Sequence, residues 1–387
     1  MILLNYKSIR IRLLPTPEQE DLINKHIDTC RWVWNYMLAE HKKHYQETGQ
    51  HLSGYDMMAI LTNLKKQEEY EWLTKISAFS LNRICRDVDF AFRQFYHKNC
   101  RYPKFKSKKT AKRSYPVRDS NNTVYFNEDD TVHIERIGDI RCNMSKIVPY
   151  GRGIKIMNPR ISLQNSKWIL TIVIGYENQV VELSNTPMGI DLGVKELAVI
   201  AYGNNITKIT NINRTKRVMN LDRKINHVRH VIDHKRNCKS SRNLPDSNKT
   251  KKYLRMLKRF CAKITNIRRD YIHKITSMLV YTLKPKIVVM EDLNIAGMVR
   301  NKRLSKSILD QKWKMFIDCM RYKCQNIGSV FMQVDRYYPS SKICSNCGHV
   351  KPKIKLRERV FVCEECGFTI DRDVNAAINL KNCSVGF

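Results

Sequence analysis

The sequence of 387 residues is poor in acidic side chains, with 36 Asp and Glu against 70 Lys and Arg. It has no apolar run that approaches the roughly 18 residues needed to span a membrane. Its first residues lack the charged and then apolar layout of a signal peptide. It also lacks a repeat of about 20–50 residues and any extended low-complexity tract. The absence of a membrane-spanning run and of a signal-like start makes a soluble protein of the cell interior the expectation.

The excess of basic residues gives a formal net charge of +34. A compact chain with this charge repels itself unless phosphates or counterions neutralise it, so the predicted partner is a polyanion such as nucleic acid. A ribosome-associated or merely basic protein is the alternative. The hydrophobic fraction of 42% is enough to form cores and excludes a wholly disordered chain. At roughly 100–200 residues per domain, the length predicts two to four domains.

Nine of the 13 cysteines are scattered without paired spacing and are interpreted as reduced, small hydrophobic residues. The other four form a regular pattern of C-x2-C, fifteen intervening residues and C-x2-C. This spacing is typical of a four-cysteine zinc ribbon, because two residues between ligands let a tight turn direct both thiolates at one metal. Glycine follows each pair directly, as such turns require. The predicted ligands of a closed, structural Zn²⁺ site are Cys344, Cys347, Cys363 and Cys366; two redox pairs or disulfides are the alternative.

Hydrophobic periodicity predicts a mixed α/β chain. Residues 5–14 alternate as a strand, and Thr16-Pro17-Glu18-Gln19 is typical of a helix start with an N-cap, Pro at the first position and Gln at the third. We expect that helix to end at Gly49, and further helices over 55–70 and 77–97. Short strands separated by turn residues follow from about 122 to 182, which predicts a small antiparallel barrel or sheet. If strand 5–14 belongs to it, the helices are an insertion.

Two segments concentrate positive charge. Residues 98–118 contain nine Lys and Arg and no acid, with Tyr102, Phe105 and Tyr115 interleaved. Phosphate-binding side chains beside aromatic rings suit a nucleic-acid groove, although a solvated basic linker is possible. Residues 214–274 hold 20 Lys and Arg against four Asp, and they predict two long basic helices with a break near residues 243–246. The predicted nucleic-acid contacts are Arg101, Lys104, Lys106, Lys108, Lys109, Lys112 and Arg113.

Three carboxylates stand out by their apolar surroundings. Asp191 lies inside a strand-like run, Glu291 ends another, and Asp373 opens a helix rich in small residues. An acid within an apolar strand costs several kcal/mol unless a cation or hydrogen bonds meet it. Three converging acids would repel one another, and a divalent metal resolves that conflict. Carboxylates without histidine suit Mg²⁺ or Mn²⁺.

Each carboxylate also has an ordinary structural interpretation when it is taken alone. Asp191 could accept turn hydrogen bonds, Glu291 could form a salt bridge, and Asp373 could cap its helix. Their neighbours Asp292 and Asp371 are second-ranked candidates, on the other strand face or outside the helix. It is the occurrence of all three acids together in a basic chain that favours a metal site that cleaves phosphodiesters.

The motifs around these residues resemble the transposon-encoded TnpB (OrfB) family, a relative of the compact type V CRISPR effectors. They are Gly189-Ile190-Asp191-Leu192-Gly193, Val289-Met290-Glu291-Asp292-Leu293, the four-cysteine ribbon and Asp371-Arg372-Asp373-Val374-Asn375-Ala376-Ala377, in that order. The run Tyr337 to Gly348, which leads into the ribbon, is also similar, apart from Pro339, where Thr or Ser is common in the family. The resemblance covers essentially the whole chain and is strongest from 186 to 380.

This resemblance implies a fold class and a domain plan. The expected fold is a multidomain α/β one, in which a RuvC-like nuclease domain of the RNase H fold carries a helical insertion and the zinc ribbon. A β-barrel wedge domain carries an inserted helical recognition lobe. The expected boundaries are 1–15 and 111–184 for the wedge, 16–110 for the recognition lobe, 185–338 and 371–387 for the nuclease with its insertion at 210–284, and 339–370 for the ribbon.

The resemblance also implies an activity: an RNA-guided DNA endonuclease of a transposon that cuts guide-matched DNA beside a short flanking motif. Asp191, Glu291 and Asp373 are the expected ligands of two Mg²⁺ or Mn²⁺ ions; Asp373 is chosen over Asp371 because the family's ligand directly precedes x-Asn-Ala-Ala. The expected partners are guide RNA and double-stranded DNA, in a prokaryotic cytoplasm and in association with the nucleoid. A non-catalytic RNA-guided regulator and an accessory transposase are the alternatives.

Overall fold

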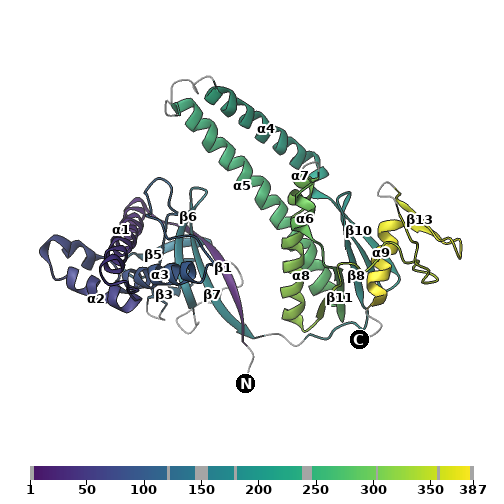
Figure 1. Ribbon diagram of the computed structural model, residues 1–387, viewed down its shortest axis with the longest axis horizontal. Helices are drawn as coiled ribbons and strands as arrows, with labels where there is room; N and C mark the ends of the chain where they lie inside the picture. Colours follow the sequence, from purple (N-terminus) through teal and green to yellow (C-terminus); the bar gives the residue numbers. More distant parts are fainter. Residues whose placement is uncertain are drawn as a thin grey trace. The chain divides into compact units, whose positions relative to one another are not determined.

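The computed structural model describes residues 4–119, 123–143, 156–177, 181–237, 246–301, 304–354 and 358–383. The chain forms two compact units, Met1–Glu177 and Asn178–Phe387, each described here by itself. Three of the predicted turns, at 121–122, 151–153 and 243–245, lie outside the described residues. Figure 1 labels the helices and strands of both units.

The first unit combines a sheet with a group of helices inserted after its first strand. Its seven strands are antiparallel and follow the order β2-β6-β7-β1-β5-β4-β3. Because β1 lies in the middle of this sheet, the prediction that the first strand joins the later ones is confirmed. The strands are β1 (Leu4–Leu14), β2 (Ser114–Pro116), β3 (Val124–Phe126), β4 (Thr131–Ile134), β5 (Gly138–Asn143), β6 (Ile156–Gln164) and β7 (Lys167–Glu177).

The helices of this unit are α1 (Pro17–Thr48), α2 (Gly54–Leu64), the short 3-10 helix η1 (Glu68–Lys75) and α3 (Ala78–Tyr96). The predicted start of α1 is confirmed, since the Thr16 hydroxyl accepts from the Gln19 N–H while the Gln19 side chain accepts from the Thr16 N–H. Gly49 ends the helix with a φ of 70°. The helices and the sheet share one continuous apolar core.

The helix predicted over 55–70 is wrong in its second half, because α2 ends at Leu64 and η1 follows. Leu64 is buried, but the next positions on the same helical face are Gln67, Glu68 and Glu71. A continued helix would therefore have no apolar face to bury there. The chain turns instead and places Leu73 in the core.

The second unit is built on a five-stranded sheet of order β10-β9-β8-β11-β12. Strands β10, β9 and β8 are antiparallel, whereas β8, β11 and β12 are parallel. The five strands are β8 (Met188–Leu192), β9 (Glu196–Tyr202), β10 (Asn205–Thr210), β11 (Ile287–Glu291) and β12 (Val330–Val334). The helix α8 (Trp313–Ile327) covers one face, where Ile190, Val288 and Phe316 are buried together.

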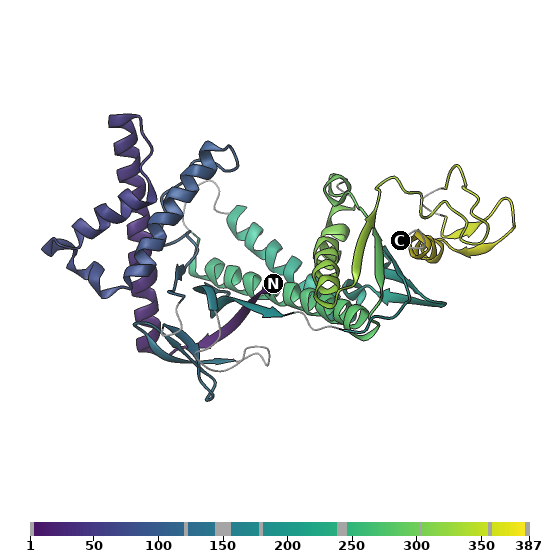
Figure 2. The ribbon, with the colours of Figure 1, turned by 90° about the horizontal axis from the view of Figure 1, so that it is seen from below.

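A last helix, α9 (Arg372–Asn382), covers the opposite face of this sheet (Figure 1). There Leu380 packs with Val289 of β11, and Ala377 packs with Val199 of β9. The small hairpin of β13 (Val360–Val362) and β14 (Thr369–Asp371) lies next to α9, in yellow in Figure 2. This sheet, covered by a helix on each face, positions the candidate site.

Between β10 and β11 the chain forms two long basic helices, as predicted. They are α4 (Lys216–Asn237), which follows the short helix η2 (Ile212–Arg214), and α5 (Asn248–Ser277), which continues as the π-helix η4 (Met278–Thr282). Val218, Leu221 and Ile225 of α4 pack with Ile264 of α5 in a narrow apolar seam. The helices α6 (Ile295–Val299) and α7 (Ser305–Gln311) connect β11 to α8.

Candidate nuclease site and metal centre

Asp191 and Glu291 lie on the same face of the second unit's sheet. In the parallel pair β8–β11, Ile190 is in register with Met290, so the next residues, Asp191 and Glu291, are also level with each other. Side chains alternate between faces along a strand. Since Gly189 and Val289 face α9, the carboxylates two residues further on face α9 as well. Both lie where their strands end, at one edge of the sheet.

Asp373 is brought to this edge by the direction of α9. Lys381 Nζ, near the end of the helix, donates to the Gly203 carbonyl at 2.8 Å, beside the start of β8. The first turn therefore lies toward the end of β8. The position of Asp371 supports the same placement, because Asp371 pairs with Lys208 of β10. Lys208 and Asp191 lie opposite the same residue of β9, so this ion pair is level with Asp191 in the sheet.

The pKa of Asp191 reflects the proximity of the other two carboxylates. Burial raises the pKa of Asp191 well above its usual range, and the neighbouring carboxylates Glu291 and Asp373 raise it further, against the opposing effect of Arg372. Burial also raises the pKa of Glu291, partly offset by a hydrogen bond from Ser340. A cluster of partly buried acids that destabilise one another's charged forms is what a divalent cation would stabilise.

The three carboxylates do not converge as closely as ligands of one ion. Within the described residues, the four ribbon cysteines are the only group of three or more His, Cys, Asp or Glu side chains whose ligand atoms all lie within 4.8 Å of one another. The donor set of the three acids is entirely oxygen, which suits Mg²⁺ or Mn²⁺.

Neither second-ranked acid is free of a competing role. Asp371 is the N-cap of α9, where its Oδ1 accepts from the backbone N–H groups of Asp373 and Val374, and its Oδ2 lies 2.7 Å from Lys208 Nζ. Asp292 pairs with Arg336 at 2.7 Å. Asp373, in contrast, is in the first turn of α9, and its ion pairs within the described residues are longer, 3.6 Å from Arg372 and 4.0 Å from Arg359.

Sequence reasoning missed a set of polar residues that join the site to the ribbon. The buried Ser340 donates from its hydroxyl to Oε1 of Glu291. Asn379 of α9 donates to the Ser340 and Ile343 carbonyls, each at 2.7 Å. Asn375 donates to Ile343 at 2.6 Å and accepts from the Ser345 N–H at 3.0 Å. Both asparagines are buried on one face of a helix, which is the signal that could have identified them.

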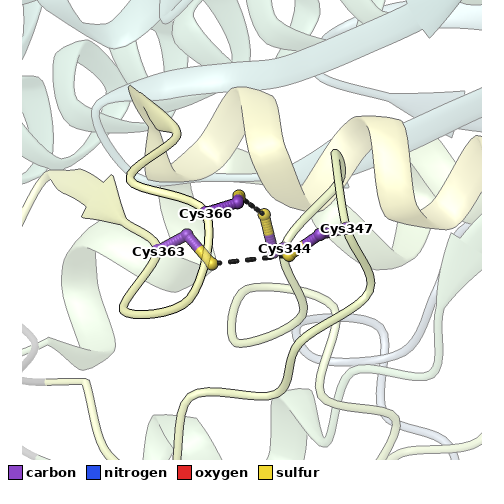
Figure 3. Close-up of side chains that lie close together, drawn as sticks. All are labelled: Cys344, Cys347, Cys363 and Cys366. Atoms are coloured by element: carbon purple, nitrogen blue, oxygen red, sulfur yellow. Dashed lines mark hydrogen bonds between the residues drawn. The ribbon is translucent and has the colours of Figure 1, made fainter.

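The four predicted zinc ligands meet in one place (Figure 3). Cys344 Sγ lies 3.8 Å from Cys366 Sγ, and Cys347 Sγ lies 3.6 Å from Cys363 Sγ, distances that exclude disulfide bonds in this arrangement. Gly348 and Gly367 have φ values of 80° and 67°, as the two turns require. Four thiolates within reach of one another fit the tetrahedral sphere of Zn²⁺.

In the first unit, part of the basic stretch lines a cavity of about 430 Å³. Of the predicted contacts, Lys106, Lys108, Lys112 and Arg113 line it, whereas Arg101, Lys104 and Lys109 do not. Sequence reasoning missed two further cations, Arg31 and Arg160, because they come from α1 and β6. Asp87 is the one acid among the lining residues of this cavity, which we name the cationic cavity.

The backbone of the basic stretch is anchored to α1 and does not behave as a solvated linker. Asn35 exchanges two hydrogen bonds with the backbone of Lys106, at 2.7 and 3.0 Å, and Trp34 Nε1 donates to the Lys104 carbonyl. Lys106 Nζ lies 3.2 Å from the centre of the Trp34 ring, and burial lowers its pKa to about 8.

Among the helices of the described residues, none combines the length and apolar composition needed to cross a bilayer.

Three family models match separate parts of this chain. They are a helix-turn-helix domain of OrfB proteins of the IS605 type at residues 1–50, a probable transposase of the same OrfB type at 171–302, and a Cas12f1-like TNB domain at 313–380. Over residues 4–48 the structure forms one strand and one continuous helix, not a helix-turn-helix.

Curated relatives extend over nearly the whole chain. A "Putative RNA-guided DNA endonuclease" of Streptomyces pristinaespiralis is 28% identical over 97% of this chain and 88% of the relative. The relative named "Putative RNA-guided DNA endonuclease InsQ", from Escherichia coli, is 26% identical over 97% of this chain and 91% of the relative. Among solved structures, the chain is similar to the protein of a Cas12f1-sgRNA-target DNA complex, with a TM-score of 0.63, 14% identity and coverage of 98% and 99%.

Proposed function

Because this chain belongs to the TnpB (OrfB) family, we propose that it is a metal-dependent endonuclease that cuts DNA matched by a guide RNA beside a short flanking motif. The observation that carries the chemistry is the juxtaposition of Asp191, Glu291 and Asp373 at one sheet edge. The names of the curated relatives and the guide RNA and target DNA of the related complex support the choice of substrate.

The proposed site holds two Mg²⁺ or Mn²⁺ ions. Two-metal sites place their ions about 4 Å apart, so their ligands need not all lie within reach of one ion. Asp191, Glu291 and Asp373 would hold these ions, which when bound would supply activation of water and stabilisation of the leaving oxygen of the phosphodiester. Asp191 and Glu291, on adjacent parallel strands, form the rigid part of the ligand set, and α9 supplies Asp373.

We assign the parts of the chain as the resemblance implies. Residues 1–15 and 111–184 form the wedge and 16–110 the recognition lobe. Residues 185–338 and 371–387 form the RuvC-like nuclease, with its insertion at 210–284, and 339–370 form a Zn²⁺ ribbon. The parallel and antiparallel five-stranded sheet, with helices on both faces, supports the RNase H-like assignment. In this plan the cationic cavity and the basic helices α4 and α5 bind phosphate backbones, while base pairing with the guide reads the sequence.

The proposal is tested with the protein, the RNA that copurifies with it, and DNA matched to that RNA in the presence of Mg²⁺. Asp191→Ala should abolish cleavage while binding of the matched DNA is retained. Asp292→Asn is the matched control, because it alters an exposed, ion-paired acid next to Glu291 and should leave cleavage intact. Equal cleavage by Asp191→Ala and the parent protein would refute the site, and binding without any metal-dependent product from the parent would indicate a regulator.

A further inference from the structure

A second cavity, of about 260 Å³, lies in the first unit between α1, α3 and the chain that follows α3. Aromatic rings make up most of its described lining. We name it the aromatic pocket. The lining residues used here are His41, Lys42, Tyr45, Phe92, Tyr96 and Tyr102. The pocket is smaller than the roughly 300–1,000 Å³ of sites for drug-sized ligands, so a ligand of one or two rings is the appropriate size.

The rings form a buried floor and an exposed rim. Phe92 is buried and stacks on His41, with ring centres 3.6 Å apart and planes 10° apart. At the rim, Tyr45, Tyr96 and Tyr102 are 47%, 43% and 46% exposed. Three exposed rings around one cavity leave apolar surface in water, and a flat aromatic ligand would cover it.

The floor also holds a polar atom without a partner. Asp89 accepts from His51 Nε2 at 2.7 Å, and His51 Nδ1 lies 2.9 Å from His41 Nε2. This contact occupies Nε2 of His41, whereas Nδ1 of His41 is buried and has no hydrogen-bond partner. A buried polar atom left without a partner is destabilising.

The surroundings of the pocket are basic. Lys42 lies at the rim, and Tyr102 stands between Arg101 and Lys104 at the start of the basic stretch that continues into the cationic cavity. A nucleic-acid strand held by those cations would pass the rim. We propose that the aromatic pocket binds one unstacked nucleobase of this strand, stacked between the exposed tyrosines. The proposal rests on the proposed function only in requiring that the protein binds nucleic acid.

The base is located by photocrosslinking with the full-length protein. The probes are single strands of about 12 nucleotides that carry 5-iodouracil, one set in RNA and one in DNA. Irradiation should attach the probe to a tyrosine of the pocket, identified by peptide mapping. A crosslink in the RNA arm assigns the base to RNA, and one in the DNA arm assigns it to DNA; either supports the pocket. Crosslinks confined to exposed tyrosines elsewhere, such as Tyr55 or Tyr337, would overturn it.

Affinity measurements separate stacking from charge. Tyr45→Leu and Tyr102→Leu should weaken binding of a base-containing strand about fivefold to a hundredfold, whereas Tyr45→Phe and Tyr102→Phe should retain it. Phe90→Leu is the matched control, an exposed ring on α3 outside the pocket. An abasic strand with the same number of phosphates should bind all variants equally.

Equal losses with the base-containing and the abasic strand, or no loss with the leucine variants, would overturn the proposal. Failure of the parent protein to bind either strand would instead count against the nucleic-acid partner itself. Thermal unfolding of each variant, expected to match the parent because the changes are at exposed positions, shows that the comparison concerns folded protein.

Discussion

Gly189 of β8 lies directly under Ala377 of α9, so closely that a Cβ atom on Gly189 would overlap the Ala377 carbonyl oxygen. The obstacle is backbone, which cannot move aside as a flexible side chain can. This contact sets the distance between the helix that carries Asp373 and the strand that carries Asp191. The small residues around both acids are therefore part of the site's geometry.

We predict that Gly189→Ala displaces α9 and destabilises the second unit by about 3 kcal/mol or more, with loss of cleavage. Chemical denaturation and a cleavage assay measure the two effects. Gly175→Ala, on a strand of the first unit where the added Cβ meets only ordinary contacts of 3.6 Å, is the control. A Gly189→Ala protein with the stability and activity of the parent would contradict this packing.

Ser340 should act on the site through Glu291. Without its hydroxyl, Ser340→Ala leaves one oxygen of a partly buried carboxylate without its hydrogen bond, so Glu291 is less well oriented toward a metal. Loss of such a supporting hydrogen bond typically costs 10–100-fold in metal affinity or activity. We expect the Mg²⁺ concentration for half-maximal cleavage to rise about tenfold, with DNA binding unchanged. Ser341→Ala, at the next position, should behave as the parent.

Removal of one ribbon cysteine should release zinc. Cys363→Ser replaces a buried thiolate in a module whose core is otherwise small, and we expect bound zinc to be lost and the ribbon to unfold. Elemental analysis of the purified protein measures the zinc, and limited proteolysis between residues 344 and 366 reports the unfolding. Cys100→Ser, an exposed cysteine outside the cluster, should keep its zinc. Zinc retained by Cys363→Ser would contradict the four-thiolate site.

The burial of Lys106 predicts a pH dependence of nucleic-acid binding. Because its pKa is lowered to about 8, Lys106 loses its charge in the free protein between pH 7 and 9, and affinity should fall over that range. Lys106→Arg keeps its charge and should flatten the profile.

The lowered pKa of Lys106 also affects folding stability. Between about pH 8 and the ordinary lysine value of 10.5, Lys106 is protonated in the unfolded chain but neutral in the folded protein. The contribution of Lys106 to the free energy of unfolding therefore rises as pH rises through this window.

Affinity measured by anisotropy at pH 7, 8 and 9 and constant ionic strength tests the predicted pH dependence of nucleic-acid binding. Lys109→Ala serves as the control, since Lys109 does not line the cationic cavity and should not change the shape of the profile. A Lys106→Arg protein whose affinity falls as steeply as that of the parent would show that another group titrates.

The fold was predictable where local chemistry decides it. The cap at Thr16, the turn at Gly49, the strand that contains Asp191 and the strand that ends at Glu291 each depend on neighbouring residues, and the structure has them. The predicted extension of the second helix to residue 70 was wrong because the residues after Leu64 provide no apolar face for a helix to bury. Hydrophobic periodicity therefore predicts that a helix exists more reliably than it predicts where the helix ends.

Motif spacing could predict the grouping of the four cysteines and the strands and helix that carry the three acids, but not the supporting contacts around them. Ser340 and Glu291 are 49 residues apart, and Arg160 reaches the cationic cavity from a strand far along the chain from α1. Such pairs depend on strand order and helix direction, which motif spacing does not encode. The two asparagines of α9 form hydrogen bonds with backbone groups. Every residue has such groups, so the sequence does not show which of them an asparagine contacts.

The order of the three acids along the chain also bears on biosynthesis. Asp191 and Glu291 leave the ribosome well before α9, which must dock on β8 before Asp373 can join them. A nascent chain that has already formed β8, β9 and β11 still lacks the third carboxylate of the proposed site. Under the proposed function, the nuclease site is therefore complete only after the basic segments at 98–118 and 214–274 have been synthesised.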